Sequence, residues 1–425
     1  MFLAIALTAV LGASEPFVMP LMPPCGATSE PACRIPAGVD PATARLRLPD
    51  TGREAFWVED DVFHVVARRS ASSVSLCCGI QSAMERIGEE PDLWALSVRV
   101  EGVEAAVLDV MIIAEGGESL PPITETLQWR GPAAPPRAEV ATVPAELLSM
   151  RRIDSHAFAE PRVIEIYRPV GDGPMPVIYL ADGESTSMFA QTLHPLIARG
   201  DLPPVMIVGL HSGPADLAPG SDGSLIRHQE YLPGWAGETQ PRFVAHDRFL
   251  VEEVLPLAEA MGASSRREDR AVAGYSNGAA WAMSMATDHP DLFGKVMALS
   301  FGWTDGGFMA RIRATRYGDV WLGAGTLEPP FHNISSQAAQ VLQPLADRVI
   351  FDSRVAGHTP IMWHDQFPSA ALWLFGPEGG GVCGGLGRLG PHKAFQHRQR
   401  HRAVQQHPVV EGLQVEARPG LGLGP

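Results

Sequence analysis

Residues 270–288 read RAVAGYSNGAAWAMSMATD, and this segment is the most informative about the fold. A short apolar run turns into a helical pattern rich in Ala and Met that begins at Asn277. Between them Gly274, Ser276 and Gly278 match G-x-S-x-G, the pattern of a nucleophile elbow between a strand and a helix. The alternative is a glycine-rich turn with an incidental serine. In the elbow, we predict that side chains at the two glycines would collide with the neighbouring strand and helix. The serine would stand at the helix N-terminus, where free N–H groups favour developing negative charge.

The sequence around the elbow, from 148 to 376, alternates short apolar runs with helical patterns. The apolar runs are VIEIYRP, MPVIYLA, PVMIVGL, DRAVAG, KVMALSF, DVWLGAG and RVIFDSRV. The helical patterns cover 185–199, 243–261, 277–288, 334–346 and 360–375. This alternation predicts an α/β domain with a doubly wound, mostly parallel sheet.

The sequence before the α/β domain has a different pattern. Residues 46–130 contain the alternating segments DVFHVVARR, SVSLCCGI, LWALSVRVEG and AAVLDVMIIAEG, which predict half-buried strands of a small β-sandwich domain. Residues 15–45 are expected to be a loose lead-in, and the proline-rich residues 131–147 a linker. The glycine-rich and polar residues 377–425 cannot bury a core and are expected to be a disordered tail.

The first residues, MFLAIALTAVLGASEP, have the outline of a secretory signal peptide over 1–14, with cleavage near Ala13. No Lys or Arg precedes the apolar run, so a membrane anchor is the alternative. No later stretch is apolar enough to span a membrane, and we expect an exported protein, periplasmic or secreted, without stable membrane insertion. The net charge of −15, without a lysine-rich stripe, argues against nucleic-acid binding.

The number and spacing of the five cysteines fit an exported protein, but only loosely. Cys25 and Cys33 could close a small loop as a disulfide. Cys77 and Cys78 are adjacent, so in a strand they would point to opposite faces and could not easily pair with each other. Cys383 lies in the tail, and no paired CxxC spacing predicts a zinc site.

A serine nucleophile needs a base, and the base needs an orienting acid. In this kind of fold both follow the serine, at the ends of later strands. Glu328 follows DVWLGAG, and His358 follows RVIFDSRV. His364 falls inside the last predicted helix, where a packing or surface role is expected. Asp305, in GWTDGG, is the rival acid. Because adjacent strand ends lie about 4.8 Å apart, we expect Glu328 to bond one nitrogen of His358 and Ser276 to lie at the other.

Residues 148–376 resemble the esterase D-type branch of the α/β-hydrolases, the family of enterochelin esterases, feruloyl esterases and mycolyltransferases. The resemblance rests on PVIYLADGE, RHQEYLPG, AGYSNGAAWAMSMATDHPDLFGKVMALS, GAGTLE and AGHTPIMWHDQFPSAALWLF. It implies the α/β-hydrolase fold and, from the position of the first domain, an immunoglobulin-like module like that of enterochelin esterases. Ala279 stands where the family often has a second glycine, which should affect packing more than chemistry.

The resemblance also implies roles for residues around the elbow. The backbone N–H groups of Asn277 and Glu184 would form the oxyanion hole. Arg227 and Glu230, in RHQEYLPG, are either a structural ion pair that holds a loop or substrate contacts. His211 would lie on the pocket side of the sheet as a hydrogen-bonded loop histidine. Two roles are possible for the tryptophans Trp235, Trp303 and Trp363: they either line an aromatic wall of the pocket or pack in the core.

Together these features predict an exported serine carboxylic-ester hydrolase that acts through an acyl-enzyme and needs no metal or organic cofactor. Its partner would be a small-molecule or polysaccharide-linked ester; a siderophore triester, a feruloylated polysaccharide and a simple acyl ester all fit. An acyltransferase with the same nucleophile and a non-catalytic binding protein on a hydrolase scaffold are the alternatives. The sequence carries no prediction of oligomeric state.

Overall fold

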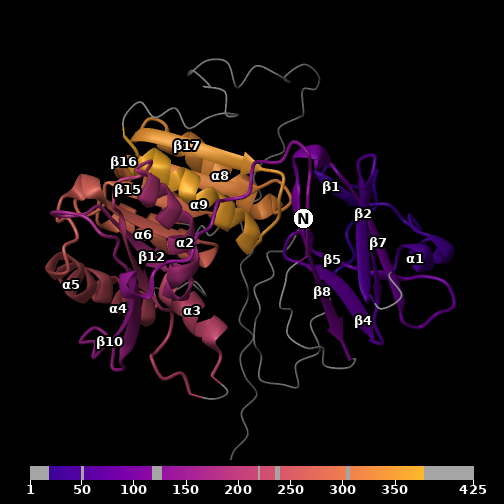
Figure 1. Cartoon of the computed structure of the whole chain (residues 1–425), viewed down its shortest axis with the longest axis horizontal. Helices are drawn as coiled ribbons and strands as arrows, with labels where there is room; N and C mark the ends of the chain where they lie inside the picture. Colours follow the sequence, from indigo (N-terminus) through magenta and orange to yellow (C-terminus); the bar gives the residue numbers. More distant parts are fainter. Residues whose placement is uncertain are drawn as a thin grey trace, which may run out of the picture. The chain divides into compact units, whose positions relative to one another are not determined.

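The structure is a computed structural model that describes residues 19–48, 52–116, 127–218, 221–234, 240–302 and 307–377. An N-terminal β-rich domain with antiparallel sheets precedes a mixed α/β part (Figure 1). Several predicted features lie outside the described residues: the signal peptide over 1–14, Trp235, Trp303, Asp305, Cys383 and the tail beyond residue 377.

The N-terminal domain consists of two antiparallel sheets. The first pairs β1 (Ala32–Arg34), β7 (Leu93–Val100), β3 (Val62–Arg68) and β2 (Glu54–Glu59) in that order, with β6 (Glu85–Arg86) also against β7. The second has the order β5 (Ser82–Ala83), β4 (Ser73–Cys77), β8 (Val107–Glu115) and β9 (Leu127–Arg130). Apolar side chains from both sheets meet in one core, among them Phe63, Leu76, Leu96 and Leu108. The four alternating segments therefore fall on β3, β4, β7 and β8, as expected.

Two expectations about the first 80 residues need correction. The segment expected to be a loose lead-in contains β1, which pairs with β7, and most of α1 (Pro41–Arg47). Cys25 and Cys33 are joined by a disulfide, which the spacing allowed. Cys77 and Cys78 are also joined, contrary to our expectation. The reason is that Cys77 ends β4 and Cys78 has a φ of 76°, so the two side chains do not alternate as in a strand.

The α/β part is built on one eight-stranded sheet. Its order is β10 (Leu148–Ile153), β11 (Arg162–Tyr167), β13 (Met206–Leu210), β12 (Val177–Ala181), β14 (Arg270–Tyr275), β15 (Lys295–Leu299), β16 (Tyr317–Gly325) and β17 (Ala346–Arg354). The strands from β12 to β17 pair in parallel, and β10 and β11 are antiparallel. All seven predicted apolar runs are strands, and the mostly parallel sheet is as expected.

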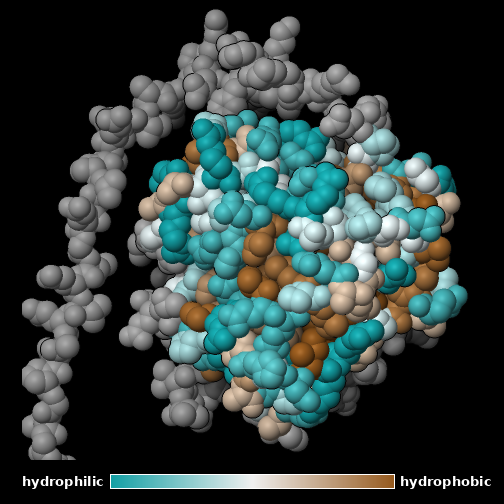
Figure 2. Space-filling model, turned by 90° about the vertical axis from the view of Figure 1, so that its left-hand side faces the viewer, coloured by the Kyte–Doolittle hydropathy of each residue, from teal (hydrophilic) through white to brown (hydrophobic). Residues whose placement is uncertain are grey.

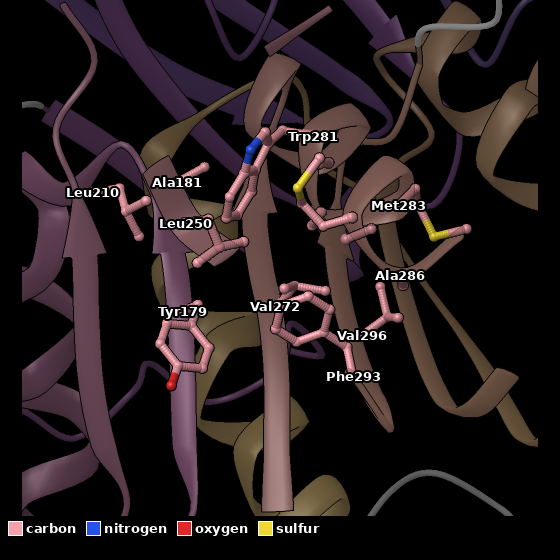
Figure 3. Close-up of a cluster of buried hydrophobic side chains, with 14 of the residues drawn as sticks. Tyr179, Ala181, Leu210, Leu250, Val272, Trp281, Met283, Ala286, Phe293 and Val296 are labelled. Carbon is pink, nitrogen blue, oxygen red and sulfur yellow. The ribbon is translucent and has the colours of Figure 1, made fainter. Parts of the chain in front are cut away.

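Helices cover both faces of this sheet because its residues alternate in direction. Tyr179 of β12 faces one core, and its neighbour Leu180 faces the other. Figure 3 shows the first core, where Trp281 and Met283 lie against the strands. That face is covered by α3 (Gly223–Tyr231), α4 (Pro241–Arg248), the π-helical η5 (Phe249–Val254), α5 (Leu255–Ala260), α6 (Asn277–Asp288), α7 (Phe308–Ala314) and α8 (Pro329–Leu342). The other is covered by α2 (Thr186–Arg199) and α9 (Pro360–Phe375).

The surface is mainly polar on the side shown in Figure 2, where a short band of hydrophobic residues crosses a hydrophilic face. Across the described ranges, no helix combines the length and apolar character that a bilayer span requires.

The parallel strands end at a common edge of the sheet, and loops at that edge are where open α/β sheets place their sites.

Candidate active site

The elbow has the strained geometry that its sequence predicts. Ser276 joins β14 to α6 with a φ of 55° and a ψ of −124°, which a non-glycine residue rarely adopts. A Cβ on Gly274 would lie 2.2 Å from the carbonyl oxygen of Gly278, the second residue of the helix. A Cβ on Gly278 would lie 3.0 Å from the side chain of Ala181, on the neighbouring strand. Close approach therefore requires glycine at Gly274 and makes a side chain at Gly278 tight, in the direction predicted.

Ser276, His358 and Glu328 form a hydrogen-bonded row. Oγ of Ser276 lies 3.0 Å from Nε2 of His358, and Nδ1 of His358 lies 2.5 Å from Oε2 of Glu328. The predicted contacts are thus confirmed as geometry. The buried carboxylate can only accept, so Nδ1 carries the proton and Nε2 accepts the hydrogen bond of the serine hydroxyl. This is the tautomer that a general base needs.

The second oxygen of Glu328 is held by two donors. Oε1 accepts hydrogen bonds from the hydroxyl of Ser300 and the backbone N–H of Gly325, each at 2.7 Å. The indole N–H of Trp363 donates to Ser300 at 2.7 Å. Glu328 is only 4% exposed, so these bonds fix its orientation and direct the other oxygen at His358. Trp363, a candidate for an aromatic wall, thus lies behind the site as a packing and positioning residue.

Aromatic rings enclose the imidazole of His358. The ring of Phe331 lies 4.2 Å away at 30°, and Trp363 meets the imidazole edge-on at 4.9 Å. Trp363 also stacks on Tyr275, the residue before the nucleophile, at 4.4 Å. Packing on both sides restricts rotation of the imidazole and keeps it in line with the serine and the glutamate.

The loop after β12 runs beside the elbow and carries Glu184. Asp182 has a φ of 55°, and Gly183–Ser185 form the 3-10 turn η3. A Cβ on Gly183 would lie 2.5 Å from the backbone of Gly209, so only glycine fits there. Asn277 is the first residue of α6, and its N–H has no partner within that helix. The fold therefore places the two backbone amides predicted for the oxyanion hole on adjacent segments.

Arg227 and Glu230 do not pair with each other. Arg227 binds Asp182 through two hydrogen bonds of 2.6 and 2.7 Å, and it also reaches the carbonyl of Tyr275 at 3.4 Å. It thereby connects the loop of Glu184 to the elbow. Glu230 is fully buried and accepts two 2.8 Å hydrogen bonds from Arg162. Burial would raise the pKa of Glu230, but its bonds with Arg162, the Gly213 amide and the charges around it together hold the pKa below the usual value.

Glu184 and His211 lie close together at the same edge. His211 Nδ1 is 3.6 Å from the Glu184 carboxylate, and burial lowers the pKa of His211. Burial of its carboxyl group raises the pKa of Glu184 to about 7, although 49% of the side chain is exposed. His364 lies within α9, as expected, where burial lowers its pKa. Within the described ranges, no group of three or more His, Cys, Asp or Glu side chains could hold a metal ion.

Ser300 was not identified from the sequence, although it directly supports the candidate acid. It ends KVMALS, at the tip of β15, and has a φ of 54°. A small polar residue at a strand end next to the elbow was the available signal. Asp182 was missed in the same way: it follows the buried strand β12 and organises the loop through Arg227 and through Tyr231, whose hydroxyl accepts its N–H at 2.8 Å.

Comparison with known proteins places this site in a family. The enterochelin esterase of Shigella flexneri is 17% identical with a TM-score of 0.58, covering 76% of this chain and 96% of that chain. A structure of the Shigella flexneri enterobactin esterase in the presence of enterobactin is 18% identical with a TM-score of 0.57, covering 80% and 99%. The ferric enterobactin esterase of Salmonella typhimurium is 16% identical with a TM-score of 0.56, covering 76% and 96%. No curated protein matches the sequence.

These identities establish a shared fold only. The sequence itself matches the model of the Esterase family, described as "Putative esterase", over residues 155–372. That range is just over half of the chain and includes the elbow, Glu328 and His358. The chain therefore belongs to the Esterase family, and its fold is similar to that of the enterochelin esterases.

Proposed function

We propose that this protein is a serine carboxylic-ester hydrolase that acts through an acyl-enzyme. The observation that carries the proposal is the hydrogen-bonded row from Ser276 through His358 to Glu328. His358 would accept the serine proton as Oγ attacks the ester carbonyl carbon, and Glu328 would stabilise the imidazolium that forms. The proton would then pass to the leaving alcohol. Water, activated by the same histidine, would release the acid and restore the serine.

The negative charge of the tetrahedral intermediate would be stabilised at the elbow. The N–H of Asn277 lies at the N-terminus of α6, where the helix dipole adds to its effect. The N–H of Glu184 would supply the second hydrogen bond, from a loop that Arg227 and Asp182 hold in place. Each such donor typically contributes about 10²–10³ in rate. Arg227 and Glu230 act in this proposal as structural residues, because both are saturated by charged partners within the protein.

Turnover of p-nitrophenyl acetate or butyrate tests the proposal. Ser276→Ala should lower kcat by on the order of 10⁶, the loss that accompanies removal of such a nucleophile. Ser284→Ala is the matched control, because Ser284 lies in the same helix and its hydroxyl donates to the carbonyl of Ala280 within that helix. Unchanged turnover in Ser276→Ala would exclude this serine as the nucleophile and with it the proposed function.

The substrate is proposed from the fold, because the similar structures are named for enterochelin and enterobactin esterases. A siderophore-type or feruloyl-type ester is the proposed class, and a small-molecule or polysaccharide-linked form would serve equally. A panel of a catecholate triester, a feruloyl sugar ester and a simple acyl ester would rank them by kcat/KM. A preference for the simple acyl ester above tenfold would count against the proposed class.

Export is part of the proposal. Residues 1–14 would act as a signal peptide, and the disulfide between Cys25 and Cys33 supports an oxidising compartment, periplasmic or outside the cell. The N-terminal domain, with two antiparallel sheets around one core, is proposed to be immunoglobulin-like. Mass spectrometry of the protein from the periplasm or the culture medium would test export; a mature chain that retains residues 1–14 would contradict it.

A further inference from the structure

Both loops that carry the candidate acid and base are packed against the N-terminal domain. Leu327, directly before Glu328, contacts the core of the two antiparallel sheets. Val355, three residues before His358, contacts the same core. The two loops thus each place an apolar side chain on a domain that contributes neither the nucleophile, the base nor the acid. This packing connects the N-terminal domain to the site, not merely to the outside of the α/β part.

Backbone hydrogen bonds join the same segments. The N–H of Val107, at the start of β8, donates to the carbonyl of Val355 at 2.9 Å, and Val107 forms a β-bridge with Ala356. The carbonyl of Ala356 in turn accepts the N–H of Leu327 at 2.9 Å. The segment before His358 is therefore held between β8 of the N-terminal domain and the loop of Glu328.

Two glycines bring the N-terminal domain into direct contact with the histidine loop. A Cβ on Gly357, the residue before His358, would lie 1.7 Å from the carbonyl oxygen of Gly79. A Cβ on Gly79 would lie 1.7 Å from Oδ1 of Asp109. Asp109, Gly79 and Gly357 therefore form a stack without room for one methyl group, and a shift of one member displaces the next.

Asp109 is the charged member of this stack. It lies on β8, is only 1% exposed, and Oδ1 has no hydrogen-bond partner among the described residues. Burial raises the pKa of Asp109 to about 6. A buried carboxyl group of this kind destabilises a fold, so its placement against the histidine loop indicates a role in the site.

We propose that Asp109 of the N-terminal domain is a positioning residue for His358. It acts through Gly79, which lies between Asp109 and Gly357, the residue before the histidine. The N-terminal domain is then a structural part of the site, because it fixes the loop that presents the imidazole between Ser276 and Glu328. The inference rests on the proposed function for its kinetic consequence, but the placement of the loop can be measured without catalysis.

Asp109→Ala removes the carboxyl group that packs on Gly79. Asp61→Ala is its control, because Asp61 belongs to the same domain but is exposed and pairs with Arg99. In the p-nitrophenyl ester assay we expect Asp109→Ala to lower kcat by about 10- to 100-fold with little change in KM, since a misplacement of about 1 Å can cost 10². Asp109→Asn keeps the shape of the side chain that packs on Gly79 and should retain most of the kcat. Asp61→Ala should behave as wild type.

The glycine contact gives a second test. Gly79→Ala adds a methyl group where a Cβ would lie 1.7 Å from Oδ1 of Asp109. It should lower kcat by a factor similar to that of Asp109→Ala, with KM changed little. Wild-type kcat in a folded Gly79→Ala variant would overturn the proposal, and this test holds if Asp109→Ala fails to fold.

Hydrogen exchange of residues 355–361 separates the inference from the proposed function. Faster exchange of these amides in Asp109→Ala, with wild-type exchange in Asp61→Ala, supports the positioning role even if the wild-type protein hydrolyses no ester. Unchanged exchange together with a kcat within about twofold of wild type would overturn it. Lack of esterase activity in the wild type would count against the proposed function alone.

Discussion

Replacement of Glu328 by glutamine tests the candidate acid most sharply, because both carboxylate oxygens have fixed partners. Oε1 accepts from Ser300 and Gly325, and Oε2 accepts from Nδ1 of His358. A glutamine has one oxygen and one amide NH₂ group. If the oxygen stays with the two donors, the NH₂ group faces His358 and favours a proton on Nε2, where the serine needs a base. If the side chain is flipped, the NH₂ group faces two donors instead.

Either orientation of Glu328→Gln therefore weakens the base. Loss of the orienting acid alone can reduce kcat by about 10⁴, which is about 5.4 kcal/mol of transition-state stabilisation at 1.36 kcal/mol per factor of ten. We expect a loss approaching this size in the steady-state hydrolysis of p-nitrophenyl butyrate, with KM changed little. Thermal unfolding of the variant provides the check that the protein is folded.

Asp305→Asn is the matched comparison, since Asp305 was the rival acid in the sequence. It should leave activity nearly intact, because the acceptor site beside Nδ1 of His358 is filled by Glu328. A kcat of Glu328→Gln within about tenfold of wild type would refute the reasoning about the acid. A larger loss in Asp305→Asn than in Glu328→Gln would transfer the role to Asp305.

Three further changes have defined expectations. Ser300→Ala removes a donor to the Glu328 carboxylate and should lower kcat by about 10- to 150-fold, since a hydrogen bond to a charged group is worth about 1.5–3 kcal/mol; steady-state kinetics measure this. Glu230→Gln removes the charge that pairs with buried Arg162 and should lower the free energy of unfolding by about 3 kcal/mol, while kcat and KM of the folded protein change little; urea unfolding and kinetics measure both. Burial raises the pKa of Asp109 from 3.8 to about 6, so the protonated carboxyl group favours the folded state. This stabilisation is fully present below pH 3.8 and is lost as the pH rises through 6. The free energy of unfolding should fall by about 3 kcal/mol over that range. Unfolding of wild type relative to Asp109→Asn from pH 4 to 7 measures this loss.

Each of these expectations can fail in a recognisable way. Wild-type kcat in Ser300→Ala would mean that the Gly325 amide alone orients the acid. A raised KM in Glu230→Gln without a loss of stability would make Glu230 a substrate contact, the role that the sequence left open. Parallel stability profiles for wild type and Asp109→Asn across pH 4 to 7 would show that the carboxyl group titrates normally.

The elbow and the candidate triad were predictable because their signals are local. Ser276, Glu328 and His358 each follow a short apolar run that forms a strand, and parallel strands bring such ends to one edge of the sheet. The helices over 277–288 and 360–375 were predicted with the bounds that α6 and α9 have. Side-chain type and position along the chain were enough for these features.

Other features lacked a local signal. The edge strand β10 reads LSMRRI, which has neither an apolar run nor a clean alternation, and it forms because β11 offers a backbone to pair with. The disulfide between Cys77 and Cys78 depends on the backbone angle of Cys78, which alternation in a strand does not reveal. The close approach of Gly79 to Gly357 joins residues 278 positions apart, so no pattern within one segment could indicate it.

Reaction with a fluorophosphonate probe tests the central claim, that Ser276 is an activated nucleophile. The folded protein is treated with the probe, and the intact mass and the labelled peptide are determined by mass spectrometry. The account predicts a single adduct on Ser276, absent in Ser276→Ala and strongly slowed in Glu328→Gln. A folded protein that stays unlabelled, or an adduct on a different residue, would contradict it.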